Sequence, residues 1–296
     1  MNNLLNRHAR PVVAGALILG LTGFALVLTD FKPYKKIQRG DEKELKVTIE
    51  GGLADVRISR GTSSSILDAE RATEESGAGR GNIEYTTRGG IGYLTVDLSP
   101  DGRDNKGSRK HKSWNLSSTS WNLRYTDAIP ISFDIELGMG EGDLDMSGLN
   151  VKDFDLSTGA SSVRLAFNEP NRTIIDNMTI EAGLSKFRAT GLGNANFRRL
   201  HFEGGLGRYS LDFSGALASE VDIDAELGLG TLTITIPSNI GARILYEKNW
   251  ICEFDFDSDF VRQNDTEYQT DNYTSARGKI NLRVQAGFGS VRIRRD

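Results

Sequence analysis

Cysteine and histidine are scarce in this 296-residue chain. The single cysteine, Cys252, excludes an internal disulfide framework and a zinc site built from several cysteines. Only three histidines are present, so histidine-rich metal centres and most catalytic mechanisms that use histidine are not expected. The composition therefore argues against metal-based and histidine-based chemistry.

Proline and net charge are also low. The chain has 6 prolines, and its 36 basic and 40 acidic residues give a net charge of −4. This balance lacks the basic excess that is typical of nucleic-acid binding, so no nucleic-acid partner is expected. Hydrophobic residues make up 38% of the chain, and with the 33 glycines the apolar share is ordinary for a globular protein. The abundance of glycine predicts many tight turns around a buried core.

Only one long hydrophobic run occurs, at residues 11–29, and it contains no charged residue. About 20 apolar residues are enough to span a bilayer. Basic residues precede the run, as in a signal sequence, but no small-residue cleavage site follows it. We therefore predict that residues 1–29 form an uncleaved signal-anchor segment, that residues 11–29 cross a membrane once, and that residues 30–43 form a basic stalk.

The charges that flank this run give conflicting signals about membrane orientation. More basic residues follow the run than precede it, and such a count places the C-terminal side in the cytoplasm. A basic N-terminus, one apolar run and a large following domain are instead typical of an exported protein. We expect the C-terminal domain to be extracytoplasmic.

A glycine-centred pattern repeats after residue 43. The copies read x-Gly-apolar-small-x-apolar-x-apolar and occupy residues 50–58, 88–96, 136–146, 157–165, 181–189, 203–211, 226–234 and 285–293. A stretch of alternating apolar and polar residues precedes each main copy, which is typical of a half-buried strand. Glycine accepts positive φ at little steric cost, so we expect each unit to be strand, glycine corner, strand. The predicted structural glycines are Gly138, Gly159, Gly183, Gly205, Gly228 and Gly287.

The spacing of the repeat favours stacked coils. From Gly138 to Gly228 the predicted corner glycines are 21, 24, 22 and 23 residues apart, and periods of 20–50 residues are typical of solenoids. The alternative is a β-sandwich of ordinary hairpins, whose turns commonly contain Asn-Gly or Asp-Gly. We predict an all-β, β-solenoid-like fold preceded by one transmembrane helix.

Two segments interrupt the repeat and set the predicted domain boundaries. Residues 44–98 hold the first copies, residues 99–130 form a polar loop or junction, and residues 131–296 form the main solenoid domain. The basic part of the junction, 99–121, is either a contact for an anionic polymer or a solvated loop. Residues 247–278 are an insertion rich in acidic and aromatic residues.

Three segments in the second half of the chain carry a family resemblance: residues 223–247, 254–260 and 268–293. Their order resembles the C-terminal domain of the LiaF-like proteins. These proteins belong to a wider toastrack group that includes adhesin-like domains of the DUF2154 and DUF4097 types. The resemblance covers residues 131–296 and, more loosely, 44–98.

The resemblance implies a single-stranded right-handed β-helix and a place in the bacterial cell envelope. The family is implicated in cell-envelope stress signalling beside histidine kinases, and it defines neither catalytic residues nor a cofactor. LiaF itself has several membrane spans, whereas this chain has one predicted span, so the resemblance supports the domain type and not the specific role. The implied location is the bacterial cytoplasmic membrane, with a single pass.

One acidic stretch is a candidate metal site. In an extended strand, Glu253, Asp255, Asp257 and Asp259 share one face, and Ca²⁺ takes six to eight hard oxygen ligands. The spacing is not that of an EF-hand loop. The alternative is an edge strand whose acidic side chains discourage aggregation.

Other reactive residues give weaker signals. His201, Ser210 and Asp212 could be paired for nucleophilic catalysis, but no nucleophile elbow is present. Arg198 and Arg199 could contact a polyanion or be ordinary surface residues. Cys252 follows two apolar residues and is expected to be a packed hydrophobic side chain.

These observations favour a non-enzymatic, membrane-anchored envelope protein whose solenoid binds a protein or polymer partner, including an anionic polymer. The long flat faces of a solenoid suit binding. The alternatives are a polysaccharide-acting enzyme on a β-helix and a purely structural adhesin or spacer. The oligomeric state stays open, because an uncapped solenoid end would invite association.

Overall fold

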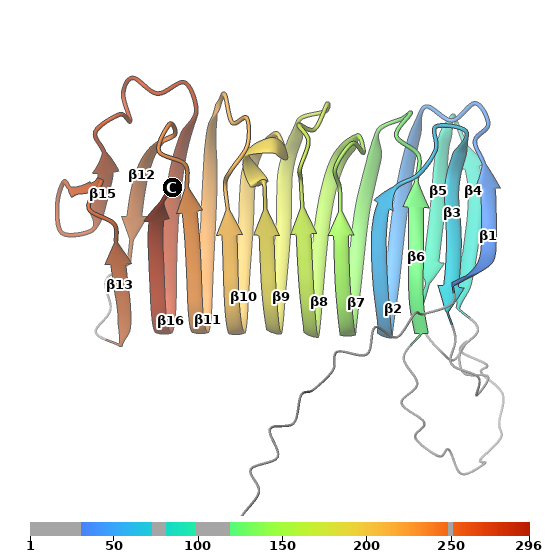
Figure 1. Cartoon of the computed structure of the whole chain (residues 1–296), viewed down its shortest axis with the longest axis horizontal. Helices are drawn as coiled ribbons and strands as arrows, with labels where there is room; N and C mark the ends of the chain where they lie inside the picture. Colours follow the sequence, from blue (N-terminus) through green and yellow to red (C-terminus); the bar gives the residue numbers. More distant parts are fainter. Residues whose placement is uncertain (1–30, 73–80, 99–118, 248–250) are drawn as a thin grey trace, which may run out of the picture. The chain divides into compact units, whose positions relative to one another are not determined.

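Long strands that bend in the middle build this protein (Figure 1). The computed structural model describes residues 31–72, 81–98, 119–247 and 251–296, within the unit Phe31–Asp296. The long strands contain 15 to 17 residues each and are β2 (Glu44–Arg60), β7 (Ile131–Asp145), β8 (Val151–Ala166), β9 (Ile175–Thr190), β10 (Phe197–Asp212), β11 (Glu220–Ile236) and β16 (Lys279–Arg295). We call each of them a rung. A short 3-10 helix, η1 (Leu192–Asn194), lies between β9 and β10.

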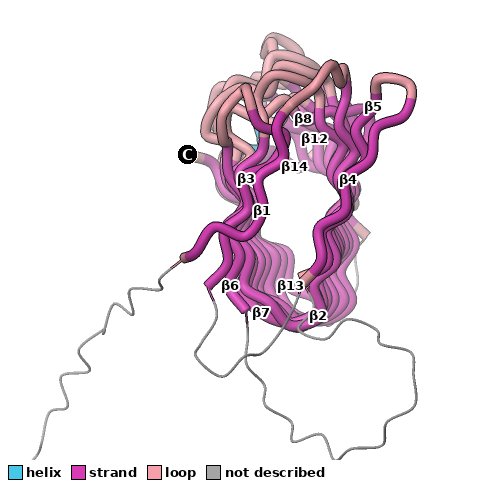
Figure 2. Tube along the Cα trace, turned by 90° about the vertical axis from the view of Figure 1, so that its right-hand side faces the viewer, coloured by secondary structure: helices cyan, strands magenta, loops and turns pink. Residues whose placement is uncertain are grey.

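The rungs pair in parallel and in register, in the order β2-β7-β8-β9-β10-β11-β16. Pairing continues on both sides of each bend; in β10 and β11 it runs from Arg199 opposite Asp222 to Asp212 opposite Thr235. The view along the stack shows that the two halves of the rungs form two walls joined at the bends (Figure 2). The prediction of an all-β, solenoid-type fold is confirmed.

A continuous hydrophobic core fills the space between the walls. Inward positions alternate with outward ones along each half rung, so that Phe154 and Leu156 are buried beside exposed Asp155. A small residue on one side of the bend is matched by a large side chain on the other side. In β10 the ring of Tyr209 occupies the space left by Gly204, and in β7 small Gly142 lies beside Leu137. In these two rungs a large side chain thus lies where glycine leaves space in the interior.

One glycine in each rung lies at the bend, and these bend glycines form a column in register: Gly52, Gly138, Gly159, Gly183, Gly205, Gly228 and Gly287. A Cβ atom added to Gly159 would lie 2.5 Å from the carbonyl oxygen of Gly138, and one added to Gly228 would lie 2.7 Å from that of Gly205. Glycine is therefore required because each bend lies against the backbone of the preceding one.

Positive φ occurs two residues further on. Gly140, Gly230 and Gly289 have φ of 130°, 133° and 127°, whereas no bend glycine has a positive φ. We expected glycine at the corner because it accepts positive φ. In the structure, positive φ occurs instead at the small residue of the repeat. Close stacking of successive bends is the reason for glycine at the bend itself.

The N-terminal end of the stack is closed by shorter strands. β5 (Ile91–Asp97) and β6 (Thr119–Tyr125) pair with the two halves of β2. β4 (Asn82–Arg88) and β3 (Ser65–Ala72) pair with them antiparallel, and β1 (Lys32–Gln38) pairs antiparallel with β3.

Three predictions about this region are wrong. Residues 30–43 are not a free stalk, because β1 joins the sheet and buries Ile37. Residues 99–130 are not wholly a polar junction, because β6 buries Trp121 in the core. The copy at 88–96 is not a bent rung: Gly89 and Gly90 have φ of 59° and 77° and form the turn between antiparallel β4 and β5, as expected for a Gly-Gly hairpin.

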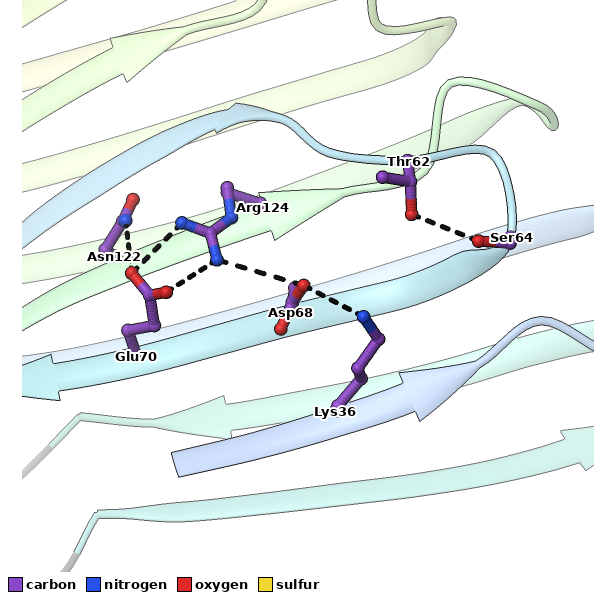
Figure 3. Close-up of polar contacts among 7 residues, drawn as sticks. All are labelled: Lys36, Thr62, Ser64, Asp68, Glu70, Asn122 and Arg124. Atoms are coloured by element: carbon purple, nitrogen blue, oxygen red, sulfur yellow. Dashed lines mark hydrogen bonds and ion pairs between the residues drawn. The ribbon is translucent and has the colours of Figure 1, made fainter. Parts of the chain in front are cut away.

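Ion pairs tie β1, β3 and β6 together on the outer surface of one wall (Figure 3). Arg124 donates two hydrogen bonds to the carboxylate of Glu70, at 2.7 and 3.0 Å, and Asn122 donates a third at 2.9 Å. Asp68 lies 3.3 Å from the Lys36 ammonium and 3.8 Å from Arg124. The hydrogen bonds from Arg124 lower the pKa of Glu70, so the capping strands are held by charged groups at neutral pH.

Short strands also close the other end. β12 (Gly241–Tyr246), just before the insertion at 247–278, and β13 (Cys252–Phe256), within it, pair with the two halves of β16. β15 (Glu267–Thr270) pairs antiparallel with β12, and β14 (Phe260–Arg262) pairs antiparallel with β15. The last repeat in the sequence, β16, therefore lies inside the stack. The described parts of 44–98 and 131–296 belong to one continuous stack, because β2 pairs with β7.

The predicted membrane span at residues 11–29 lies outside the described residues. Within 31–72, 81–98, 119–247 and 251–296, no helix is long and apolar enough to cross a membrane.

The bend contacts predict unequal effects of alanine within one column. Gly159→Ala should destabilise the protein by about 1–3 kcal/mol, because its Cβ would overlap a backbone oxygen that cannot move alone. Gly183→Ala should cost less, because its nearest atom, the Thr158 carbonyl oxygen, is 3.1 Å from the added Cβ. Urea unfolding of both variants followed by circular dichroism tests this, and equal unfolding midpoints would contradict it.

Candidate functional site: a groove along the bends

A groove runs along the outer side of the bends. It consists of two adjoining hollows, of about 560 and 390 Å³, which share Glu203 and Gly205 as lining residues. The bend glycines and the residues just before them, such as Thr158 and Ala182, line it. The groove exists because glycine leaves no side chain at the centre of each bend.

One side of the groove carries a row of carboxylates two residues before the bend glycines. We call Glu50, Glu136, Glu181, Glu203 and Glu226 the glutamate row; Ser157 and Gln285 occupy the same position in β8 and β16. All five glutamates are exposed. Across the residues that the structure describes, no lysine, arginine or histidine lies within ion-pair distance of these five carboxylates.

The stacking of these charges does not stabilise the fold. Neighbouring parallel strands lie about 4.8 Å apart, and like charges directly opposite each other in a sheet are destabilising. Only Glu181 receives a side-chain hydrogen bond in the described region, from the Ser157 hydroxyl at 3.3 Å. The row is therefore available to cations from outside the chain.

Exposed hydrophobic side chains follow the bend glycines and lie next to the groove, outside its lining residues. We call the residues that directly follow the bend glycines the apolar row: Met139, Leu184, Leu206, Leu229 and Phe288, which are between 45% and 59% exposed. Scattered exposed hydrophobic residues are ordinary, but these are stacked on the sheet register, with Ala160 filling the position in β8. A continuous exposed apolar strip is typical of an interaction site.

Neither row was recognised from the sequence, although the signal is present. Five copies of the repeat have glutamate two residues before the glycine, in the segments EGGL, ELGM, EAGL, EGGL and ELGL. An exposed apolar residue follows the glycine in most of them. Recognising a row required the parallel, in-register pairing that places one copy directly above the next.

The structure does not form the predicted Ca²⁺ site. Pairing of β13 with β16 places the acidic residues beside arginines. Arg294 forms ion pairs with Asp255 and with Asp257, the latter at 3.2 Å, and Asp259 lies 3.9 Å from Arg295. Glu253 is exposed on the same strand. In the described part of the chain no group of three or more acidic, histidine or cysteine side chains could hold a metal ion.

The residues considered for catalysis are not brought together. His201 and Ser210 both alternate with buried residues of β10, but they lie on opposite walls because the bend separates them. Asp212 lies on the same wall as Ser210 and accepts a hydrogen bond from the Ser214 backbone. Arg198 forms an ion pair with Asp176, and Arg199 is an exposed residue of β10.

Cys252 begins β13 and is buried against the end of the stack. Burial raises the pKa of its thiol, so the thiolate that reacts is disfavoured. Aromatic residues of the cap surround this end, with the rings of Phe256 and Tyr268 stacked 4.0 Å apart.

Parallel bent rungs, a glycine column and closed ends define an all-β, solenoid-type protein. The family model for the N-terminal domain of toast_rack, DUF2154, matches residues 29–188 of the sequence, which is more than half of the chain. The chain therefore belongs to the toast_rack family, and the predicted toastrack resemblance is confirmed. The matched residues include the N-terminal capping strands and β2. They lie nearer the N-terminus than the three segments that carried the resemblance.

Several solved structures are similar to this chain. A candidate cell adhesion protein from Clostridium sporogenes has 19% identity and a TM-score of 0.43, covering 90% of this chain and 100% of that chain. A candidate adhesin from Bacteroides fragilis has 13% identity and a TM-score of 0.28, covering 89% and 97%. A candidate lipid binding protein from Parabacteroides distasonis has 11% identity and a TM-score of 0.27, covering 90% and 96%. No curated protein matches.

The ion pairs of the C-terminal cap predict a pH-dependent contribution to stability. Hydrogen bonding and charge from Arg294 lower the pKa of Asp255 below its ordinary value of 3.8, so this stabilisation is present above about pH 3.8 and is lost as the pH falls further. Arg294→Gln should therefore lower the melting temperature at pH 7 and have a smaller effect at pH 3.

The same arrangement predicts the response to calcium. Addition of millimolar Ca²⁺ should change the melting temperatures of the wild-type chain and of an Asp257→Asn/Asp259→Asn variant equally, because Asp255, Asp257 and Asp259 already face guanidinium groups. A calcium-dependent rise that the variant abolishes would show that these side chains rearrange around an ion.

Proposed function

We propose that this protein is a non-enzymatic, membrane-anchored scaffold of the bacterial cell envelope that binds a partner along the bend groove. The observation that carries the proposal is the pairing of two rows along the bends: the glutamate row, which forms no ion pair among the described residues, and the apolar row of exposed side chains. Membership of the toast_rack family supports the envelope setting. A role in the envelope stress response rests on the family resemblance.

The groove suits binding better than hydrolysis of a polysaccharide. A glycosidase uses two carboxyl groups in different environments, one to donate a proton and one to attack or activate water. The glutamates of the row are equivalent, exposed and on one side of the groove. A binding surface, by contrast, gains from repetition of the same contact.

The charge of the groove favours a cationic partner over the anionic polymer that the basic segment suggested. A polyanion would meet five uncompensated carboxylates along the groove. The wholly structural alternative, a spacer without a ligand, gives no reason for like charges to be stacked at an energetic cost.

Membrane anchoring through residues 11–29, a single pass and an extracytoplasmic solenoid complete the proposal. A membrane-impermeant thiol reagent applied to intact cells tests the orientation. Cys252 is buried and a poor target, so the probe is Ser258→Cys, at an exposed position of the C-terminal cap, in a Cys252→Ser background. Labelling before lysis is expected; labelling only after lysis would place the solenoid in the cytoplasm.

Photo-crosslinking in living cells tests the binding role. A photoreactive phenylalanine analogue replaces Leu206 in the apolar row or Ile174 in a connection at the opposite edge; these side chains are 49% and 46% exposed. A discrete adduct, identified by mass spectrometry, is expected at Leu206 and not at Ile174. Equal crosslinking at both positions would contradict a specific partner site in the groove.

A further inference from the structure

We propose that the partner of the bend groove is a cationic amphipathic α-helix that lies along the groove, across the rungs, with a basic stripe against the glutamate row and an apolar stripe against the apolar row. This inference rests on the proposed function and names the chemistry and the conformation of the partner. Three observations carry it: the charge of the surface, the position of the apolar row and the spacing of the rungs.

The charge balance of the surface selects a cation. Besides the glutamate row, the position three residues after the bend glycine holds Asp55 in β2 and Glu141 in β7. Basic residues occupy this position only in β9 and β10, as Lys186 and Arg208. At this position acidic and basic residues balance, so the acidic excess beside the apolar row comes from the glutamate row, and a cationic partner would relieve the mutual repulsion of those carboxylates.

The apolar row selects an amphipathic partner. A simple polycation could satisfy the carboxylates but would leave Leu184, Leu206 and Phe288 in water. A partner with an apolar stripe beside its basic stripe would cover both rows together. Burial of apolar surface supplies affinity that does not depend on salt, whereas exposed charge pairs alone contribute little.

The spacing of the rungs selects a helix. Successive rungs are about 4.8 Å apart along the groove, and the carboxylates of the glutamate row lie one or two rungs apart. Side chains on one face of an α-helix recur about every 5.4 Å along its axis, a difference that flexible lysine side chains can absorb. Side chains on one face of an extended peptide recur about every 6.7 Å and lose register after two rungs. The six intervals from Glu50 to Gln285 span about 29 Å, which matches a helix of about 19 residues.

A second copy of the chain fits this surface less well. Face-to-face packing of two grooves would bring together two surfaces that each carry a net negative charge. Like-charge contact across an interface is strongly unfavourable. Self-association is therefore an outcome that the test must be able to detect.

The test uses the full chain in phosphatidylcholine nanodiscs and a fluorescent 18-residue peptide of leucine and lysine. Leucine stands at positions i, i+3, i+4 and i+7 of the peptide, and lysine fills the adjacent face. Fluorescence anisotropy measures binding, and empty nanodiscs give the lipid background. We expect saturable binding that weakens as salt is raised. A peptide with glutamate in place of lysine, and one with two central prolines that break the helix, should not bind above background.

Protein variants locate the binding. Glu181→Gln/Glu203→Gln should weaken binding roughly three- to tenfold, as expected for two exposed charge pairs. The matched control, Asp41→Asn/Asp271→Asn, removes the same charge from exposed positions in the connections that precede β2 and β16, away from the bends in the middle of the rungs, and should leave affinity unchanged. Leu184→Ser/Leu206→Ser should weaken binding, whereas Ile174→Ser/Val261→Ser, which removes similarly exposed side chains elsewhere, should not.

Several results would overturn the inference. Equal weakening by the groove pair and its control would show non-specific attraction, and equal binding of the proline-containing peptide would exclude a helix. Sedimentation of the nanodiscs as dimers that the Leu184→Ser/Leu206→Ser variant abolishes, without peptide binding, would assign the groove to a second copy. If Leu206 crosslinks a partner in cells but the peptide does not bind, this inference fails while the proposed binding role stands.

Discussion

Contact between successive bends is the constraint on which the rest of the structure depends. The Cα of each bend glycine lies so close to the carbonyl of the preceding bend that most positions have no room for a Cβ. This contact holds the rungs in register on both walls, and any slip by one residue would move apolar side chains out of the core. Tyr209 reinforces it from inside, because its hydroxyl donates to the carbonyl oxygen of Gly183 at 2.7 Å.

The same constraint creates the surface that we assign to binding. Once the bends are in register, every residue at a fixed distance from the bend glycine must form a row. Residues that are ordinary in one copy, a glutamate before the bend and a leucine after it, become an acidic row, interrupted at Ser157, and an apolar row, interrupted at Ala160. The groove along the bends is the consequence of glycine at the bend.

Short strands cover both ends of the stack and limit further strand pairing there. At one end β1 carries Lys32, Pro33, Lys35 and Lys36 along an edge, residues that discourage further strand pairing. The Lys35 ammonium and the Tyr34 hydroxyl also donate to the carbonyls of Ile83 and Gly81. At the other end three short strands and a cluster of aromatic rings cover β16 and β12. These caps reduce the end-to-end association that an open solenoid would undergo.

The sequence by itself determined the strand periodicity, the bends and the approximately 22-residue repeat, because alternation and recurrent glycine are local signals. It also carried the family resemblance. Only the tertiary structure decided that β16 lies inside the stack, that residues 32–38 and 119–125 are strands, and that the acidic residues of β13 face arginines rather than an ion. These outcomes depend on pairing between residues far apart in the chain, such as Asp255 with Arg294, which no local pattern encodes.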